Sequence, residues 1–331
     1  MSDYALRFQR NLGVLSISEQ ERLRDTNVLI IGDGGTGETI AIILARCGME
    51  RFTIAGEGVY AASDMNRQAC CFLDTIGEQK VSVIKDTILK INPNARVSTL
   101  NHLPRGEELD TLIKECAIVI PAVDDLSYSI LCFRSARKQT RPAVLCIPSG
   151  SLGWVCAFSH KTPTIEDVFG IPSLDYEGLR RIMHSREYRC AQYNFITSGD
   201  WRVSWFWEYF SGKRDLALLC PVSWIASSLA AMEVLKIATG KWRPTYAPKC
   251  WYIRKGTVAQ SHFSLFIKYH RKLGWAIFGN GIGRHLHRLA LWFWRRFFLY
   301  LKHSQDKAVP DTRSSIPPTP PLDLKGDQPD V

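Results

Sequence analysis

The stretch Val28-Leu-Ile-Ile-Gly-Asp-Gly-Gly-Thr-Gly-Glu38 decides the fold, because an apolar run is followed directly by glycines spaced as G-x-G-x-x-G. Residues 28–31 predict a short buried β-strand, and residues 38–48 predict an apolar helix that a glycine ends. In such a turn, glycine permits a sharp bend, lets the backbone approach a phosphate and lets the helix pack on the strand. The sequence therefore predicts a phosphate cradle made of Gly32, Gly34, Gly35 and Gly37.

A second predicted strand, residues 51–56, completes a β-α-β unit of the dinucleotide-binding type. In that type, an acidic residue at the end of the second strand holds the ribose hydroxyls. This chain has Gly56-Glu57-Gly58 at that place, so Glu57 is the acidic residue available. Arg67 and Lys80 follow. Because fixed cations stabilise charge that develops on phosphates, both are expected to reach a bound triphosphate, and ordinary surface charges are the alternative.

Several motifs, in order along the chain, carry a resemblance to a known family. They are Arg7-x-x-Arg10, the glycine stretch quoted above, S-x-x-N-R-Q at residues 63–68, I-G-x-x-K at residues 76–80 and Asn-Pro at residues 92–93. This set resembles the ThiF/MoeB/HesA group, the relatives of the ubiquitin-activating enzymes. The resemblance covers residues 4–150 well and residues 220–253 more loosely. The N-R-Q and I-G-x-x-K pair is its most specific part.

The resemblance implies an enzyme that binds ATP with Mg²⁺ and adenylates a carboxylate, commonly the C-terminal Gly-Gly of a ubiquitin-like protein. It implies that Arg67 and Lys80 contact the triphosphate and that Asp124 binds the metal ion. Arg10 would reach into the site of the partner subunit of a homodimer. The other residues expected to bind the nucleotide, besides the glycines, are Glu57, Asn66 and Gln68.

Two departures from the family pattern affect the predicted nucleotide site. Family members usually have D-x-D where this chain has Gly56-Glu57-Gly58, and the first of those aspartates holds the ribose of ATP. Asp64 also stands where an asparagine is usual. Loss of the charged contact to the ribose would weaken binding by about 1.5–3 kcal/mol. Three outcomes stay open: Glu57 compensates through a kink, the nucleotide binds less tightly, or a different nucleotide is bound.

The composition favours an intracellular α/β protein with a distinct basic segment. The chain has 331 residues, ten cysteines without a C-x-x-C pair, and a net charge of +10. Without C-x-x-C pairs, no zinc site is expected. No secretory leader is visible, so a cytoplasmic location with reduced thiols is expected, including a peripheral position at the inner face of a membrane. Residues 234–305 contain no acidic residue, and the excess positive charge belongs to them.

The expected fold class is α/β: a Rossmann-like, mostly parallel sheet with helices on both faces, an antiparallel extension at residues 152–158, and a basic aromatic C-terminal helical appendage. Ser16 or Ser18 is expected to cap a helix in the N-terminal arm, with Glu21 completing a capping box for Ser18. The predicted parts are an N-terminal helical arm (1–27), an ATP-binding core (28–158), a variable crossover and substrate insert (159–219), the closing helix and strand of the core (220–253), the appendage (254–304) and a disordered Pro-rich tail (305–331).

The predicted appendage, residues 254–304, mixes Arg, Lys and His with Trp, Phe and Tyr, as is typical of a helix lying in a membrane interface. An anionic membrane surface is therefore one expected partner, and docking of a basic helix on protein is the alternative. No nucleic-acid recognition motif accompanies the charge, so nucleic acid is not expected to bind. Cys156 and Cys190 are the candidates for a covalent intermediate, against the alternative that both are inert.

Together, these features predict an ATP-dependent adenylyltransferase that activates a carboxylate as an acyl-adenylate. The carboxylate would belong to a ubiquitin-like or sulfur-carrier protein, or to a peptide. The alternative is a catalytically degenerate nucleotide-binding scaffold recruited to a membrane surface. An NAD(P)-dependent oxidoreductase that uses Glu57 for the ribose is disfavoured, because it leaves the N-R-Q motif and Lys80 unexplained.

Overall fold

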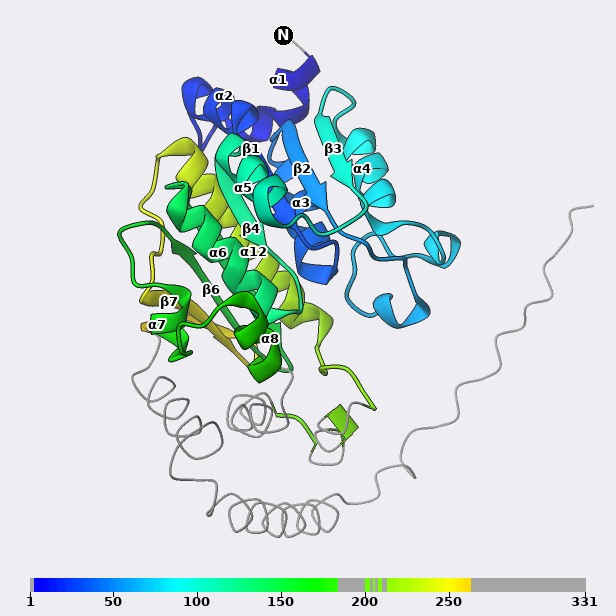
Figure 1. Ribbon diagram of the computed structural model, residues 1–331. Helices are drawn as coiled ribbons and strands as arrows, with labels where there is room; N and C mark the ends of the chain where they lie inside the picture. Colours follow the sequence, from blue (N-terminus) through cyan, green and yellow to red (C-terminus); the bar gives the residue numbers. More distant parts are fainter. Residues whose placement is uncertain (1–2, 184–199, 203–204, 206–207, 210–212, 263–331) are drawn as a thin grey trace, which may run out of the picture. The chain divides into compact units, whose positions relative to one another are not determined.

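An eight-stranded sheet organises the part of the chain that the structure describes, with the strand order β3-β2-β1-β4-β5-β6-β7-β8 (Figure 1). The structure is a computed structural model, and it describes residues 3–183, 200–202, 205, 208–209 and 213–262. All of these residues belong to one compact unit. Cys190, most of the predicted appendage and the predicted Pro-rich tail lie outside the described residues.

The first five strands are parallel and have the order 3-2-1-4-5, which is that of a Rossmann fold. The strands that follow them run antiparallel, so the prediction of a mostly parallel sheet with an antiparallel extension is confirmed. The strands are β1 Asn27–Ile31, β2 Arg51–Ala55, β3 Arg96–Leu100, β4 Ile118–Pro121, β5 Ala143–Ser149, β6 Leu152–Phe158, β7 Lys249–Arg254 and β8 Thr257–His262.

Helices cover both faces of this sheet, as predicted, and each face has its own hydrophobic core. One face is covered by α3 Gly35–Arg46, α4 Lys80–Ile91 and α12 Cys220–Thr239. The other face is covered by α5 Gly106–Glu115, α6 Leu126–Lys138, α7 Ile165–Phe169 and α8 Tyr176–Met183. The N-terminal arm contains α1 Asp3–Phe8, η1 Gln9–Asn11 and α2 Ile17–Asp25, and short turns of 3₁₀ helix, η2 Ala62–Asp64 and η3 Leu73–Thr75, precede α4.

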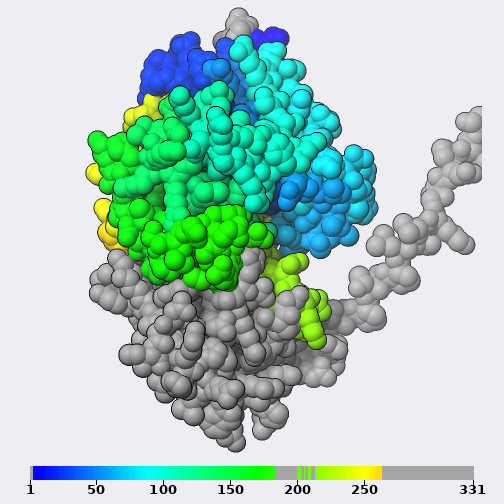
Figure 2. Space-filling view, in the orientation of Figure 1, coloured from blue at the N-terminus to red at the C-terminus, as the bar shows by residue number. Residues whose placement is uncertain are grey.

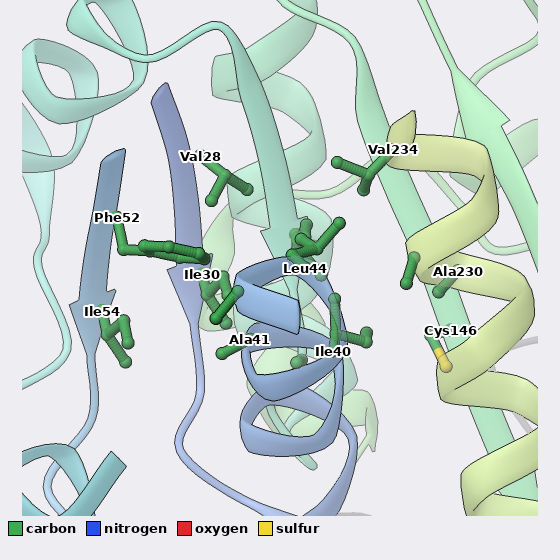
Figure 3. Close-up of a cluster of buried hydrophobic side chains, with 14 of the residues drawn as sticks. Val28, Ile30, Ile40, Ala41, Leu44, Phe52, Ile54, Cys146, Ala230 and Val234 are labelled. Carbon is green, nitrogen blue, oxygen red and sulfur yellow. The ribbon is translucent and has the colours of Figure 1, made fainter. Parts of the chain in front are cut away.

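Strand β1 shows how the apolar run quoted above builds both cores. Its side chains alternate: Val28 and Ile30 join the core under α3, and Leu29 and Ile31 join the core on the opposite face. All four side chains are fully buried. Figure 3 shows Val28 and Ile30 packed among side chains from β2, α3 and α12. A strand buried on both faces reads as a continuous apolar run, which explains the sequence pattern.

The glycine turn fixes the position of α3 on the sheet. Gly32 has a φ of +115°, and a Cβ atom there would lie 2.3 Å from the carbonyl oxygen of Ala122. A Cβ atom on Gly37 would lie 2.0 Å from the carbonyl oxygen of Gly32. A Cβ atom on Gly34, in contrast, would meet nothing within 4 Å. Gly32 and Gly37 are therefore required for packing, whereas Gly34 leaves open space beside the turn.

Three local predictions differ from the structure. Helix α3 begins at Gly35 rather than Glu38. The capping box of α2 consists of Ser16 and Glu19, not Ser18 and Glu21, because Ser16 accepts a hydrogen bond from the backbone of Glu19 at 3.2 Å. The sheet also continues past residue 253: β8 pairs antiparallel with β7, so residues 257–262 are a strand and not part of a helical appendage.

Helix α12 is long and apolar enough, by length and composition alone, to span a membrane. Half of it is buried in the protein. It packs on α3 and on strands β5 and β6, with small residues such as Ala226 and Ala230 fully buried at the contact. These contacts identify α12 as a core helix of the α/β fold, as the sequence predicted.

We expect Gly37→Ala to destabilise the fold and Gly34→Ala to leave its stability unchanged. The first substitution forces a methyl group against the Gly32 carbonyl, and overpacking of this kind costs about 1–3 kcal/mol. The second places its methyl group in open space. Chemical denaturation of both variants measures the difference. Equal unfolding free energies for the two variants would contradict the packing role given to Gly37.

Candidate nucleotide-binding site

A pocket of about 490 Å³ lies at the carboxyl ends of the parallel strands. Its walls come from the turns that follow β1, β2 and β4 and from strand β5, together with residues of the crossover segment and α12. β1 and β4 are neighbours, but the chain leaves them toward opposite faces of the sheet. Such a switch point is where open α/β sheets bind ligands. Figure 2 shows the face of the molecule that carries both the 56–79 segment (lighter blue) and α7 and α8 (green).

Four of the described helices point their N-terminal ends at this pocket. Gly35 of α3, Lys80 of α4, Leu126 of α6 and Ser223 of α12 all lie in the first turn of their helices and all line it. The N-terminus of a helix carries partial positive charge and unpaired backbone N–H groups. Their convergence makes the pocket suited to an anion, and a phosphate is the anion that such termini commonly bind.

The glycine turn supplies the floor of the pocket. Gly34 and Gly35 line it, and no protein atom lies within 4 Å of a Cβ atom built on Gly34. A ligand atom can therefore approach the backbone N–H groups at the start of α3. Gly32 also lines the pocket. Gly37 does not, because it faces the Gly32 carbonyl, so its role is packing rather than contact with a ligand.

Asp64 links the two predicted phosphate-binding cations. Its carboxylate lies 2.8 Å from the Lys80 ammonium and 3.4 Å from the Arg67 guanidinium. The same carboxylate accepts hydrogen bonds from the Gln68 side chain at 2.7 Å and from the Ala61 backbone at 3.1 Å. Asp64 is buried, so an unpaired charge there would be costly. The aspartate that departs from the family pattern therefore holds both cations in place.

Arg67 and Lys80 both line the pocket, although only Arg67 is substantially open to solvent. The Lys80 side chain is 10% exposed and the Arg67 side chain is 28% exposed. Arg67 also donates to the carbonyl of Ser63 at 3.0 Å, and its own carbonyl accepts from the Trp224 indole at 3.0 Å. The motif is thus clamped between its own loop and α12, with the guanidinium beside the opening.

The two adjacent aspartates after β4 have different roles. Asp125 caps α6, where its carboxylate accepts the backbone N–H of Ser127 at 2.9 Å. Asp124 lines the pocket, is accessible to solvent, and makes no hydrogen bond or ion pair with the other described residues. Although Asp124 is in contact with solvent, the protein around it displaces part of its hydration, and this desolvation raises the pKa of Asp124. The positive charges of Arg67 and Lys80 lower this pKa and so oppose the rise. Asp124 is therefore the carboxylate free to bind a cation.

Other polar atoms of the pocket have no protein partner within the described part of the chain. The side-chain carbonyl oxygen of Gln68 and the hydroxyl of Ser223 are buried without a hydrogen bond. Glu57 lies just past the end of β2, at the exposed edge of the pocket. Buried polar atoms normally find hydrogen-bond partners, so the unpaired oxygen atoms of Gln68 and Ser223 indicate that a polar ligand completes the site.

Two further residues predicted to act at the site lie outside this pocket. Asn66 donates to the carbonyl of Leu218 at 3.1 Å and accepts from Arg67 at 2.9 Å, so it positions the loop. Arg10 is exposed, and its neighbour Asn11 bonds to Cys47 at the far end of α3. A helix of twelve residues is about 18 Å long, so Arg10 does not reach the pocket of its own chain.

Cys156 is unsuited to act as a nucleophile. It lies fully buried in β6, and burial raises the pKa of its thiol well above the ordinary value. A thiol that stays protonated in an apolar core is inert. The other cysteine considered, Cys190, lies outside the described residues.

Sequence reasoning missed Asp33 and Ser223 as pocket residues. Asp33, in the glycine turn, directs its carboxylate toward the segment after β2, where Oδ2 accepts the backbone N–H of Gly58 at 2.8 Å. Ser223 lies in the predicted closing helix of the core, where the sequence indicated no site residue, and it lines the pocket. From the crossover segment, apolar and aromatic residues line the pocket: Phe169, Tyr209, Leu216 and Leu218. The predicted crossover is thus part of the pocket wall.

Behind the glycine turn, Glu38 of α3 is completely buried. It accepts hydrogen bonds from the Tyr60 hydroxyl and from the backbone N–H of Cys70 at 3.0 Å. Burial raises the pKa of Glu38 to about 7, and the two hydrogen bonds act against that rise. These contacts tie the first turn of α3 to the segment that carries Arg67.

The sheet order and the glycine turn define a Rossmann-like α/β protein with a phosphate-binding type of turn. Among known families, the ThiF family matches residues 8–270, and the chain belongs to this family. The family resemblance read from the motifs is therefore confirmed.

The chain is similar to adenylyltransferases and to HesA proteins. It is 24% identical to the protein HesA of Nostoc sp. over 225 residues, which are 68% of this chain and 75% of HesA. It is 31% identical to the molybdopterin-synthase adenylyltransferase of Escherichia coli over 229 residues, 68% of this chain and 78% of that protein. A solved structure of Escherichia coli MccB with ATP has the same fold, with a TM-score of 0.56 at 18% identity, covering 75% of this chain and 67% of that chain.

We expect Glu38→Gln to remove part of the pH dependence of stability. A carboxyl group whose pKa is raised by folding stabilises the protein below its unfolded pKa of 4.5, and this contribution is lost as the pH rises to about 7. The full effect is on the order of 3 kcal/mol for a shift of this size. Denaturant unfolding of both proteins at pH 4.5, 6 and 8 measures it. Parallel pH profiles would contradict the assignment.

Proposed function

We propose that this protein is an ATP-dependent adenylyltransferase that activates a carboxylate as an acyl-adenylate. A carboxylate oxygen of the substrate attacks the α-phosphorus of ATP and forms the new P–O bond. The bond from the α-phosphorus to the bridging oxygen breaks, and pyrophosphate leaves with the bonding electrons. The protein need not exchange a proton in this step, so positioning and charge stabilisation carry it.

The observation that carries the proposal is the convergence of Arg67 and Lys80 on the pocket above the glycine turn. Phosphoryl chemistry spreads negative charge over several oxygens, and fixed cations and helix N-termini stabilise that charge without reorganising. Asp64 holds both cations before ATP binds. Lys80 is buried, is paired with Asp64 and lines the pocket beside helix N-termini, which is the placement expected of a lysine that contacts a phosphate.

Mg²⁺ fits the charge balance of the pocket. The two cations are already paired with Asp64, and Asp124 and Glu57 add negative charge without a cationic partner among the described residues. A triphosphate would add more. Mg²⁺ is usually held by one or two carboxylates together with substrate phosphates, and Asp124 offers such an oxygen. The ion would neutralise phosphate charge and orient the leaving pyrophosphate.

The proposed substrate is the carboxylate of a ubiquitin-like or sulfur-carrier protein, or of a peptide. The apolar residues from the crossover segment, Phe169, Tyr209, Leu216 and Leu218, support this, because they give one wall of the pocket the character of a peptide-binding surface. The relative named molybdopterin-synthase adenylyltransferase supports adenylyl transfer as the reaction class.

A homodimer is part of the proposal. Arg10 lies at the end of α3 remote from its own pocket, so a second subunit would have to bring it to a nucleotide. Exposed apolar side chains on the N-terminal arm, Leu6, Leu12, Val14 and Ile17, support burial of this arm against another copy. We also propose a cytoplasmic location, and contact of the residues after β8 in the predicted appendage 254–304 with an anionic membrane surface; those residues lie outside the described ranges.

The scaffold alternative has one specific observation in its favour, which is the lack of a carboxylate at Gly56. It predicts that ATP binds weakly or not at all. A nucleotide-binding measurement therefore separates the two functions before any substrate is known.

We expect Lys80→Met to lower ATP-dependent pyrophosphate exchange by about 100-fold to 1000-fold, as removal of one preorganised charge-stabilising group does elsewhere. Methionine keeps the apolar stem of the side chain, which packs beside Gly58. The assay uses radiolabelled pyrophosphate, ATP·Mg²⁺ and carrier proteins or peptides that end in Gly-Gly.

Lys90→Met is the matched control, because Lys90 lies on the same helix and is exposed away from the pocket. It should leave exchange unchanged. Circular dichroism and thermal unfolding verify that both variants fold. Exchange that survives in Lys80→Met, or ATP binding that is absent in the unmodified protein, would overturn the proposed function.

A further inference from the structure

Gly56 and Asp33 lie so close together that only one of the two positions can carry a side chain in the space between them. A Cβ atom built on Gly56 would lie 2.3 Å from Cγ and 2.4 Å from Oδ2 of Asp33. It would also lie 2.6 Å from the Asp33 Cβ, so rotation of the carboxylate alone would not relieve the clash. The Asp33 side chain therefore fills the volume that a side chain at position 56 would take.

The sheet explains why residues 33 and 56 lie next to each other. β1 and β2 are parallel neighbours, with Ile31 paired with Ala55, so the residues that follow them emerge side by side. The backbone N–H of Gly32 donates to the carbonyl of Ala55 at 2.7 Å, which keeps the two turns together. A carboxylate can thus reach the end of β2 either from β2 itself or from the turn after β1.

The Asp33 carboxylate is held in place and open to a ligand. Its Oδ2 accepts the backbone N–H of Gly58 at 2.8 Å. No hydrogen bond to its Oδ1 is found within the described part of the chain, and Asp33 is half-buried in the wall of the pocket. A carboxylate has about four acceptor positions, so both oxygens retain capacity. The lack of a side chain at Gly58 leaves space beside Oδ1 of Asp33, because a Cβ atom at position 58 would lie 3.0 Å from this oxygen.

We propose that Asp33 binds the ribose hydroxyls of the nucleotide, and that it makes the site selective for ribonucleotides over 2′-deoxyribonucleotides. The end of the second strand is where a carboxylate meets the ribose in folds of this kind. Here that carboxylate comes from the glycine turn. The inference rests on the proposed function, since it assigns a role at the same ATP site.

The other carboxylates of the pocket are less suited to the ribose. Asp64 is engaged with Lys80 and Arg67, and Asp125 caps a helix. Asp124 follows β4, not β2. Glu57 is exposed at the edge and makes no hydrogen bond with other described residues. Asp33 follows β1, but its carboxylate lies against Gly56 and Gly58 at the end of β2, and the bond from the Gly58 backbone fixes its orientation.

The magnitude of the selectivity follows from hydrogen bonding to a charged group. Such a bond contributes enough to change a dissociation constant by about 10-fold to 100-fold. A site built to bind a hydroxyl also discriminates strongly against an analogue that lacks it. We expect the full-length protein to bind ATP·Mg²⁺ at least 10-fold more tightly than 2′-deoxyATP·Mg²⁺.

Isothermal titration with these two nucleotides tests the role of Asp33. Asp33→Asn is expected to weaken ATP binding about 10-fold or more and to bring the ATP to 2′-deoxyATP ratio close to one. Asp86→Asn is the matched control for loss of one negative charge, because Asp86 is exposed on α4 outside the pocket. It should leave the ratio unchanged. If Asp33 had a purely structural role, Asp33→Asn would weaken the binding of both nucleotides equally and leave the ratio of their affinities unchanged.

A transfer of the carboxylate gives the second arm. Gly56→Asp alone should disturb the site, because its side chain would collide with Asp33. Asp33→Ala combined with Gly56→Asp should restore both ATP affinity and the preference for ribose, since the carboxylate then comes from β2. Thermal unfolding of each variant separates lost binding from lost folding.

The outcomes distinguish this inference from the function on which it rests. If the unmodified protein binds neither nucleotide, the proposed ATP site fails and the inference fails with it. If ATP binds and exchange activity is present, but Asp33→Asn keeps the ratio, only the inference is overturned. If Glu57→Gln instead removes the preference for ATP over 2′-deoxyATP, the carboxylate that binds the ribose is Glu57, and the inference about Asp33 is equally overturned.

Discussion

The close approach of Gly37 to the carbonyl oxygen of Gly32 is the constraint on which the site depends. With no side chain at position 37, α3 rests directly on the turn after β1. That contact aims the start of α3 into the pocket and leaves space beside Gly34. The neighbouring strands then bring the starts of α4 and α6 to the same edge of the sheet. An anion site thus results from packing before any charged side chain contributes.

The charged side chains depend in turn on Asp64. Its buried carboxylate holds Lys80 and Arg67 within ion-pair distance, so both cations are positioned at the pocket in advance. Positioned cations stabilise phosphate charge at little reorganisation cost, which is the physical basis of the proposed catalysis. The same carboxylate would compete with the phosphates of a bound nucleotide for the two cations. Asp64 therefore balances positioning against affinity, and Mg²⁺ at Asp124 would restore the charge needed to hold a triphosphate.

The sequence predicted those features whose signals are local. The run 28–31 is apolar because β1 is buried on both faces, and the placement of Arg67 and Lys80 at one pocket agrees with the spacing of the two motifs. β8 could not be predicted, since its residues are mostly exposed and lack alternation. The choice between Ser16 and Ser18 as cap was undecided because both are followed by a glutamate three residues later.

The features of the site that were missed are non-local. Asp33 acts through the space that Gly56, on the neighbouring strand, leaves free, and neither residue shows this by itself. Asn66 belongs to the N-R-Q motif, yet it faces Leu218 from the crossover segment rather than the pocket. The resemblance pointed to Asp124 rather than Asp125, and the start of α6 gives the physical reason, because Asp125 caps that helix and Asp124 lines the pocket.

A crystal structure of the protein with a non-hydrolysable ATP analogue and Mg²⁺ tests the central claim most directly. We predict that the phosphates lie against the backbone N–H groups of Gly34 and Gly35, with Arg67 and Lys80 within contact distance and the metal ion beside Asp124. A nucleotide bound elsewhere, or phosphates that contact neither Arg67 nor Lys80, would contradict the account.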